Sequence, residues 1–264
     1  PLGTGGEYSG TGVTLVSPGM YVFDPTNGLV SGGTVLNPGE YPVTFRYTNV
    51  EGCYDEKNIT FTVYPSNATG SCPGTLTDYR DSQVYSTFLA GTGAGANCWM
   101  AVNLNYGDYS TYSQLQTDNC TPEKYCKDNI LSNCSQSGGY YQWAELMMYQ
   151  ENTAYQDLCP PGWHLPSASE WESLITFYSG VGKAGSPMKD LHPASGFHGL
   201  LEGILYQNNS WSFTTGTLTG SLFWTSSSLS PSTAVARGIN STNPSVSYYP
   251  SSKAHAFPVR CVRN

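Results

Sequence analysis

The stretch from Cys159 to Trp171 combines a cysteine, three prolines and a helix-start signal, and it constrains the fold more than any other part of the sequence. The proline rings hold the backbone extended up to Ser167. Ser167 and Glu170 then form a Ser-x-x-Glu capping box, in which each side chain accepts a hydrogen bond from the other residue's backbone amide. The sequence therefore predicts a helix that begins directly after Ser167.

The predicted helix has a single apolar face. Trp171, Leu174, Ile175 and Tyr178 recur at spacings of three and four residues, which places them on one side of an α-helix. Gly180 follows where such a helix would stop, because glycine commonly ends helices. This pattern is typical of a helix that packs one face on a core.

Charged residues are scarce in this chain. They make up 11% of 264 residues, whereas Gly, Ser, Thr, Asn and Tyr are abundant, so solubility depends on hydroxyl and amide groups, as is common on extracellular surfaces. The net charge is -8, from 11 Lys and Arg against 19 Asp and Glu. Nucleic-acid binding requires a basic face, so we exclude a nucleic-acid partner.

The chain has eight cysteines and no Cys-x-x-Cys motif, a pattern that favours disulfides in an oxidising compartment. Its four histidines lie far from any close Cys/His pair of the kind that binds zinc, so no metal site is predicted. No apolar run approaches the ~18 residues that a membrane span needs. The opening Pro1-Leu2-Gly3 matches the remnant of a cleaved tag, so this start is compatible with a removed signal peptide or anchor.

Residues 7–66 are predicted to be all-β. Apolar and polar residues alternate over 41–47 and 59–63, which is the pattern of strands with one apolar face. The segment Gly39–Cys53 resembles the last hairpin of bacterial immunoglobulin-like repeats that serve as stalks in surface proteins. The short strands and this resemblance indicate an immunoglobulin-like β-sandwich over 7–66, without a ligand. The composition of the following residues indicates a linker at 67–76.

From Thr77 to the C-terminus several motifs occur in one order. They are Asp78–Tyr85, Cys98–Tyr106, Lys124–Cys126, Gly138–Met147, Cys159–Trp171 and Ala256–Arg263. This series resembles the Fibrobacter succinogenes major paralogous domain, a family with a C-type lectin-like fold related to formylglycine-generating enzymes. The resemblance implies that 77–264 is one α+β domain, with two helices on a small twisted antiparallel sheet and long loops. Trp143, Leu146 and Met147 provide a second helix-like face that agrees with this expectation.

The family pattern also informs the disulfides. It implies the pairs Cys126–Cys134 and Cys159–Cys261, which leaves Cys98–Cys120 as a third pair. Cys53 is expected to bridge to Cys72 across the linker and to stiffen it. The connectivity is a hypothesis, because eight cysteines allow about 105 arrangements.

The relation to formylglycine-generating enzymes raises an oxidoreductase alternative, because those proteins use a pair of redox-active cysteines. Every cysteine here has an expected partner, so no reactive thiolate is predicted. We interpret His164 as a packed, hydrogen-bonded turn residue in preference to a general base, and His198 with Glu202 as loop residues in preference to metal ligands. The sequence thus predicts no enzyme, no catalytic residue and no cofactor.

The last 42 residues, from Phe223 to Asn264, contain no Asp or Glu, so a calcium-dependent sugar site is not expected there. They are rich in Tyr, Ser and Asn, which antibody loops use because tyrosine provides contact area at low entropic cost. With a disulfide anchoring its far end, this segment is predicted to form a binding face. The face comprises Trp224, Ser226, Ser227, Ser228, Arg237, Asn240, Thr242, Asn243, Ser247, Tyr248, Tyr249, Ser251, Ser252 and His255.

Some members of the resembled family are variable proteins of diversity-generating retroelements, whose C-terminal segments are rewritten at adenine-containing codons. Pro244 and Pro250 depart from the Asn-rich pattern of such segments. We therefore expect a monomeric surface or secreted protein that binds a protein or glycan ligand on this face, and the resemblance raises diversification of the face by a retroelement. The alternatives are the oxidoreductase and a structural cell-surface or adhesion component.

Overall fold

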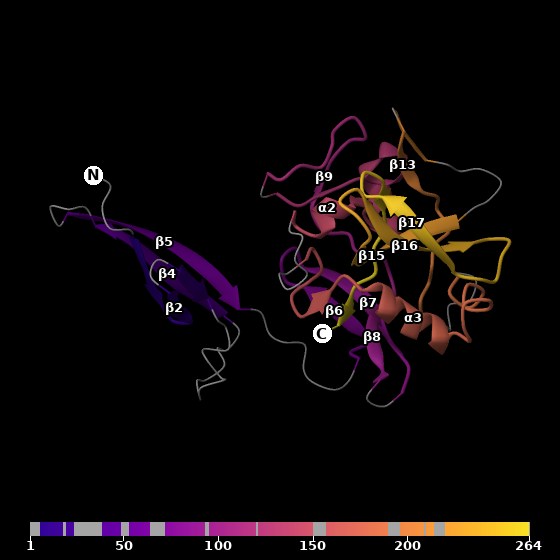
Figure 1. Ribbon diagram of the computed structural model, residues 1–264, viewed down its shortest axis with the longest axis horizontal. Coiled ribbons are helices and arrows are strands. Elements are labelled where there is room, and N and C mark those ends of the chain that lie inside the picture. The colour runs from indigo at the N-terminus through magenta and orange to yellow at the C-terminus, as the bar shows by residue number, and fades with distance from the viewer. Residues whose placement is uncertain are drawn as a thin grey trace. The chain divides into compact units, whose positions relative to one another are not determined.

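The structure, a computed structural model, forms two compact units, Pro1–Thr69 and Gly70–Asn264 (Figure 1). Each unit is described by itself. The structure describes residues 6–17, 20–23, 39–48, 53–63, 72–92, 95–119, 121–149, 157–189, 196–208, 210–213 and 220–263.

The first unit consists of antiparallel strands, as its alternating pattern predicts. β1 (Gly6–Gly10), β4 (Gly39–Thr48) and β5 (Tyr54–Val63) form one sheet with β4 in the centre. β2 (Val13–Ser17) and β3 (Met20–Phe23) form a separate hairpin. The predicted strands at 41–47 and 59–63 lie in β4 and β5, and Val43 of β4 is buried. Of the predicted linker, residues 67–71 lie outside the described residues.

A five-stranded antiparallel sheet of the second unit has the strand order β12-β19-β8-β7-β6. It pairs strands from the beginning of this unit with the last strand of the chain. Its first three strands in the chain are β6 (Thr75–Asp78), β7 (Gln83–Ala90) and β8 (Asn97–Met100). β12 (Trp163–His164) and β19 (Val262–Arg263) complete it. Because β19 pairs with both β8 and β12, the C-terminal strand lies inside the sheet and next to the predicted helix start.

Two further sheets of this unit contain short strands. β11 (Tyr141–Gln142), β18 (Ala256–Phe257), β13 (Leu205–Asn208) and β14 (Ser210–Phe213) pair in that order. β9 (Asp108–Tyr109) runs parallel to β10 (Glu123–Lys124).

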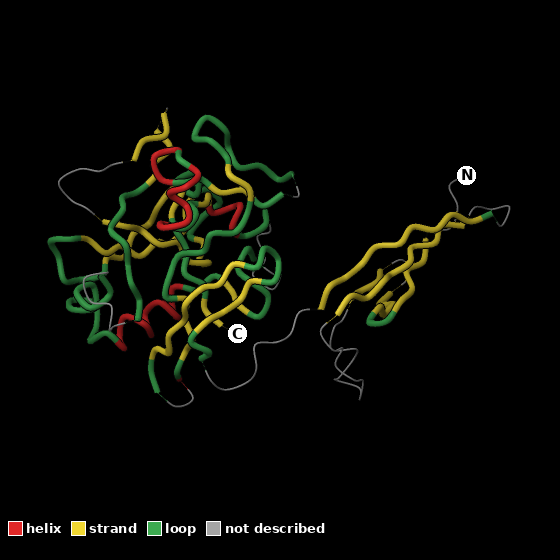
Figure 2. The backbone as a smooth tube through the Cα atoms, turned by 180° about the vertical axis from the view of Figure 1, so that it is seen from behind, coloured by secondary structure: helices red, strands yellow, loops and turns green. Residues whose placement is uncertain are grey.

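The sheet that carries most of the predicted binding face has three strands in chain order. They are β15 (Gly220–Ser228), β16 (Thr233–Asn240) and β17 (Ser247–Ser252). All pairings are antiparallel, β16 is central, and β17 is one of the two edge strands. Viewed from behind in Figure 2, strands and loops dominate the second unit and the helices are few.

The described residues contain three α-helices, so the unit is β-rich, with fewer helical residues than strand residues. α1 (Cys134–Ser137) and α2 (Trp143–Leu146) are single turns, the former preceded by the 3-10 turns η3 (Lys127–Asn129) and η4 (Leu131–Asn133). α3 (Ala168–Phe177) confirms the predicted helix. Both reciprocal bonds of the capping box are present, between Ser167 and Glu170.

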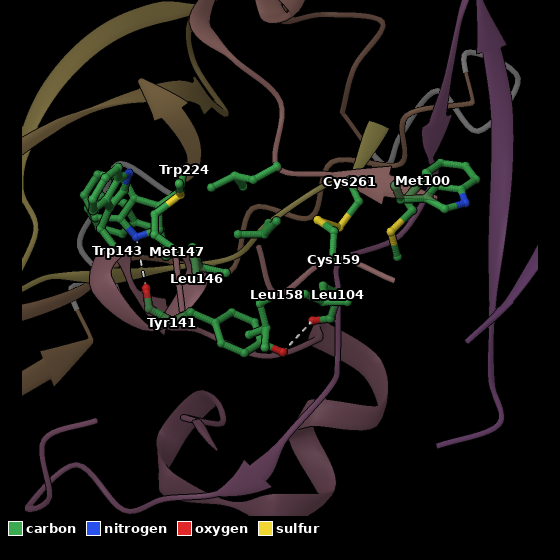
Figure 3. Packing of buried hydrophobic residues seen from close by; sticks show 14 of the residues in the cluster. Met100, Leu104, Tyr141, Trp143, Leu146, Met147, Leu158, Cys159, Trp224 and Cys261 are labelled. Atoms are coloured by element: carbon green, nitrogen blue, oxygen red, sulfur yellow. Dashed lines mark hydrogen bonds between the residues drawn. A yellow bond between two sulfur atoms is a disulfide. The ribbon is translucent and has the colours of Figure 1, made fainter. Parts of the chain in front are cut away.

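The β15–β16 strands separate two hydrophobic cores. On one side Trp171, Leu174 and Ile175 of α3 pack in the same core as Phe223 and Ile239. On the other side is a core drawn in Figure 3, in which Leu222 and Trp224 pack with α2 and the disulfide Cys159–Cys261. Successive residues of β15 thus enter different cores, because side chains alternate along a strand.

The disulfides correct part of the predicted connectivity. Cys126–Cys134 and Cys159–Cys261 are present as expected. Cys72 is bonded to Cys98, so the predicted pairs Cys53–Cys72 and Cys98–Cys120 are wrong. The reason is the sheet. β6 follows Cys72 and pairs with β7, which in turn pairs with β8, and β8 contains Cys98. Cys53 is exposed in the first unit, and Cys120 lies outside the described residues.

Candidate functional site

Edge strand β17 displays the most prominent part of the predicted face. Tyr248 and Tyr249 are 51% and 45% exposed, whereas their partners Arg237 and Ala236 in β16 are buried. Pro250 follows and is also exposed; it is tolerated here because an edge strand need not donate outward. The two tyrosines are therefore large exposed rings on β17, and pairing with the central strand β16 fixes the backbone position of that strand.

The two tyrosines lie on opposite faces of the sheet, because consecutive residues of a strand point in opposite directions. Tyr248 pairs with Arg237, whose guanidinium carbon lies 5.1 Å from the centre of the Tyr248 ring. Arg237 also donates to Glu172 of α3 at 2.5 Å. The Tyr248 side is thus the side that α3 covers.

Tyr249 lies at the end of a row of aromatic side chains that begins in the core. Trp224 packs on Phe257 with ring centres 4.4 Å apart, and the ring centres of Phe257 and His255 are 6.2 Å apart. His255 meets Tyr206 edge-on, with ring centres 4.9 Å apart. Tyr249 pairs with Ala236, which also pairs with Trp224, so Tyr249 lies on the same face of its sheet as Trp224. We call these five residues the aromatic row.

The row passes from buried to exposed. Trp224 and Phe257 are 0% exposed, His255 and Tyr206 are half-buried, and Tyr249 is the most exposed member. Burial lowers the pKa of His255, so its imidazole is uncharged at neutral pH. Burial, followed by the neighbouring Tyr249, raises the pKa of Tyr206, so its hydroxyl stays protonated. The two half-buried members of the row, His255 and Tyr206, are therefore uncharged at neutral pH.

Trp224 is the main correction to the predicted face. It is fully buried, and its indole nitrogen donates to the carbonyl of Tyr141 at 2.9 Å (Figure 3). Its side chain points from β15 into the core that also contains Leu222, so it cannot contact a ligand at the surface. Arg237 and Ser251, 3% and 5% exposed, are likewise not surface residues.

The serines at the end of β15 mostly hold α3 in place. The hydroxyl oxygen of Ser227 accepts a hydrogen bond from the Ala168 amide, and the Ser226 amide donates to the Pro166 carbonyl, both at 2.9 Å. Ser228 is exposed and donates to the Ser230 carbonyl. Two of the three predicted serines thus bind the capping-box segment.

The β16–β17 turn is polar and exposed, but its side chains fold back on the backbone. Asn240 accepts from the amides of Thr242 and Asn243, and Asn243 accepts from the Ser245 amide. The carbonyl of Asn243 accepts from the side chain of Lys189 at 3.1 Å. These residues shape the turn at one end of β17. Ser247, the first residue of β17, pairs with Gly238 at this end. At the other end of β17, Ser252 accepts from the Ala254 amide.

Sequence reasoning missed Tyr206, which lies outside the predicted segment. It joins the site because β13 pairs with β18 through Leu205 and Ala256, next to His255. The only local signal is the short alternation around Leu205, and nothing in it identifies β18 as the neighbour.

The residues considered for catalysis are engaged in structural bonds. His164 is hydrogen-bonded to Glu170 at 2.7 Å, beside the capping box. The carbonyl of His198 accepts from Arg260, and Glu202 lies 3.5 Å from the amine of Lys127. Within the described ranges, no group of three or more His, Cys, Asp and Glu side chains is arranged to hold a metal ion.

Across the described part of the chain, none of the helices has both the length and the apolar character needed to cross a membrane. A sequence model described as the Fibrobacter succinogenes major domain matches residues 93–263. No curated protein and no solved structure matches the chain significantly.

Proposed function

Because the chain belongs to the Fibrobacter succinogenes major domain family, we propose that its second unit is a C-type lectin-like scaffold that binds a ligand non-covalently at β17. In this proposal the first unit is an immunoglobulin-like spacer, and the protein acts at the cell surface or after secretion. Three disulfides in the second unit support an oxidising location.

The observation that carries the proposal is the exposure of Tyr248 and Tyr249 on a sheet that is buried behind them. Their neighbours Val235, Ala236 and Arg237 are 2%, 0% and 3% exposed. Exposing two large aromatic rings to water costs free energy, because apolar surface is more stable when it is buried. A ligand that covers the rings would recover this free energy. Exposed aromatic anchors on a rigid support are typical of binding surfaces, where tyrosine and tryptophan provide most of the affinity.

The support for these rings is rigid because both ends of the segment are fixed. Cys261 bonds to Cys159, which precedes α3 in the chain. Ser227 bonds to the first turn of α3. A ligand would therefore meet rings whose positions are set before binding, which lowers the entropic cost of association.

The experiment is to probe arrays of purified glycans and surface proteins with the full chain and with the double variant Tyr248→Ala/Tyr249→Ala. Each tyrosine is expected to contribute about 1–3 kcal/mol, so the double variant should bind at least ten times more weakly. Tyr79→Ala is the matched control, because Tyr79 is also 51% exposed but lies outside the β15–β17 sheet. A double variant that binds like the parent contradicts the proposal.

The proposal includes diversification of the exposed positions by a retroelement. Sequencing the 3′ part of the gene from many cells of the source population tests this component separately. Substitutions restricted to the segment around β15–β17, with a near-copy of the same stretch nearby in the DNA, would support it. An invariant stretch without a copy would mean a fixed ligand.

A further inference from the structure

We propose that the ligand at the Tyr249 side of β17 is an uncharged saccharide, which stacks on Tyr249 and Tyr206 and bonds through its hydroxyl groups to the row's polar atoms. This inference rests on the proposed function and names its ligand class. It also assigns a binding role to Tyr206, which lies outside the segment that the sequence singled out.

The shape of the exposed rings favours a small cyclic ligand. Tyr249 and Tyr206 come from different sheets. Tyr249 lies on the same face of its sheet as Trp224, and ring contacts lead from Trp224 through Phe257 and His255 to Tyr206. A pyranose ring has faces of C–H groups that pack on aromatic rings and a rim of hydroxyls. The tyrosine hydroxyls and the imidazole of His255 are the hydrogen-bonding groups beside those rings.

The buried part of the row explains how the platform keeps its geometry. Phe257 packs between Trp224 and His255, and the indole of Trp224 is held by the Tyr141 carbonyl. His255 in turn contacts Tyr206 at 86°, an edge-to-face arrangement that aromatic pairs prefer. The exposed rings are therefore backed by side chains that cannot rearrange without disturbing the core.

The distribution of charge favours an uncharged ligand over an anion or a cation. No Asp or Glu occurs from Phe223 to the C-terminus, and β13 and β14 contain no charged residue. Of the nearby cations, Arg237 is bonded to Glu172, and the amine of Lys253 lies 3.8 Å from the ring centre of Trp143. A charged ligand would lose hydration here without meeting an opposite charge, whereas an uncharged polyol exchanges hydroxyl–water bonds for hydroxyl–protein bonds.

A protein partner is the competing reading of exposed tyrosines. A stable protein interface buries roughly 800 Å² on each side, and its rim is usually polar or charged. Because adjacent tyrosines of β17 lie on opposite faces, one flat partner surface cannot cover both rings equally. A saccharide needs only the Tyr249 side.

The test measures binding of the full chain to oligosaccharides of glucose, mannose, galactose and xylose, with sialyllactose and heparin as charged comparators. Saturation-transfer NMR detects contact, and titration calorimetry gives affinity. Tyr249→Ala and Tyr206→Ala are expected to weaken binding of an uncharged saccharide about tenfold or more. Tyr206→Phe keeps the ring and loses the hydroxyl, so it should weaken binding less. Tyr248→Ala should weaken binding less than Tyr249→Ala, and Tyr79→Ala should leave it unchanged.

Two results would overturn the inference while the proposed function stands. In one, the chain binds charged glycans or a protein but no uncharged saccharide, and the Tyr248→Ala/Tyr249→Ala double variant loses that binding. The other is saccharide binding that depends on Tyr248 and not on Tyr249 or Tyr206. Unchanged binding in the double variant would contradict the proposed site itself. Thermal unfolding of each variant shows whether its fold is retained. If Tyr206→Ala unfolds, the role of Tyr206 in saccharide binding is judged from the affinity of Tyr206→Phe.

Discussion

Arg237 of β16 and Glu172 of α3 form an ion pair at 2.5 Å, although the Arg237 side chain is 3% exposed and that of Glu172 is 54% exposed. The pair connects the face of the sheet below Tyr248 to the helix that begins at the capping box. A buried guanidinium is costly unless a partner compensates its charge. The exposed glutamate therefore has a larger structural role than its position on the surface suggests.

Replacing this glutamate is expected to destabilise the second unit. Glu172→Gln removes the charge that faces Arg237, and we expect a loss of about 1–2 kcal/mol in the free energy of unfolding, between the values for exposed and buried pairs. Urea denaturation measures it. In an Arg237→Met background the same substitution should have almost no effect; an equal loss in both backgrounds would show that the pair does not act as described.

The capping box predicts a second stability effect. Ser167→Ala removes the hydroxyl that accepts from the Glu170 amide, and we expect a loss of about 1 kcal/mol. Ser173→Ala on the exposed side of the same helix is the control, because its hydroxyl donates only to the Ser169 carbonyl within the helix. Thermal or urea unfolding should separate the two variants; equal stabilities would argue against the cap.

The stability contributed by Glu170 should depend on pH. Burial by itself would raise the pKa of Glu170, but hydrogen bonds from His164 and from the amide and hydroxyl of Ser167 outweigh it and lower the pKa. A carboxyl with a lowered folded-state pKa stabilises the fold above its unfolded pKa, about 4.3, and loses that effect as pH falls through the folded-state value.

We therefore expect Glu170→Gln to cost about 1 kcal/mol at neutral pH, as the charge-assisted bonds are lost. The difference from the parent should shrink as the pH falls below about 4. Urea unfolding between pH 3 and 7 measures it. If the difference in the free energy of unfolding between the parent and Glu170→Gln stays constant over this pH range, the proposed role of the Glu170 carboxylate is wrong.

The disulfides should differ in their effect on stability according to the loop that each closes. Cys159 and Cys261 are 102 residues apart, whereas Cys126 and Cys134 are 8 apart. Loop entropy predicts about 4–5 kcal/mol for the long loop and about 2–3 kcal/mol for the short one. Chemical denaturation of the paired alanine variants tests the order, and a larger loss from Cys126→Ala/Cys134→Ala would contradict it.

Signals carried by neighbouring residues predicted several elements of this fold correctly. The capping box located the start of α3, and the spacing of Trp171, Leu174 and Ile175 identified its buried face. Alternation located β4 and β5. Such signals suffice because helix caps and the period of a strand depend on residues a few positions apart. The ordered motifs also indicated the family, which the match over 93–263 establishes.

The arrangement of the candidate site depended on contacts between distant segments. Trp224 looked like an exposed anchor in a serine-rich stretch, but its strand packs between two cores, so it is buried. Cys72 met Cys98 because of the order of strands in a sheet, and the sequence does not state that order.

The sequence by itself determined where α3 begins, where β4 and β5 lie, which family the chain belongs to, and that its C-terminal segment is rich in tyrosine and serine. Only the tertiary structure decided which face of the β15–β17 sheet α3 covers, and that Tyr206 joins the aromatic row on the opposite face. The physical reason is that burial and neighbourhood depend on which strands pair across the chain. Local propensity carries no record of those pairings.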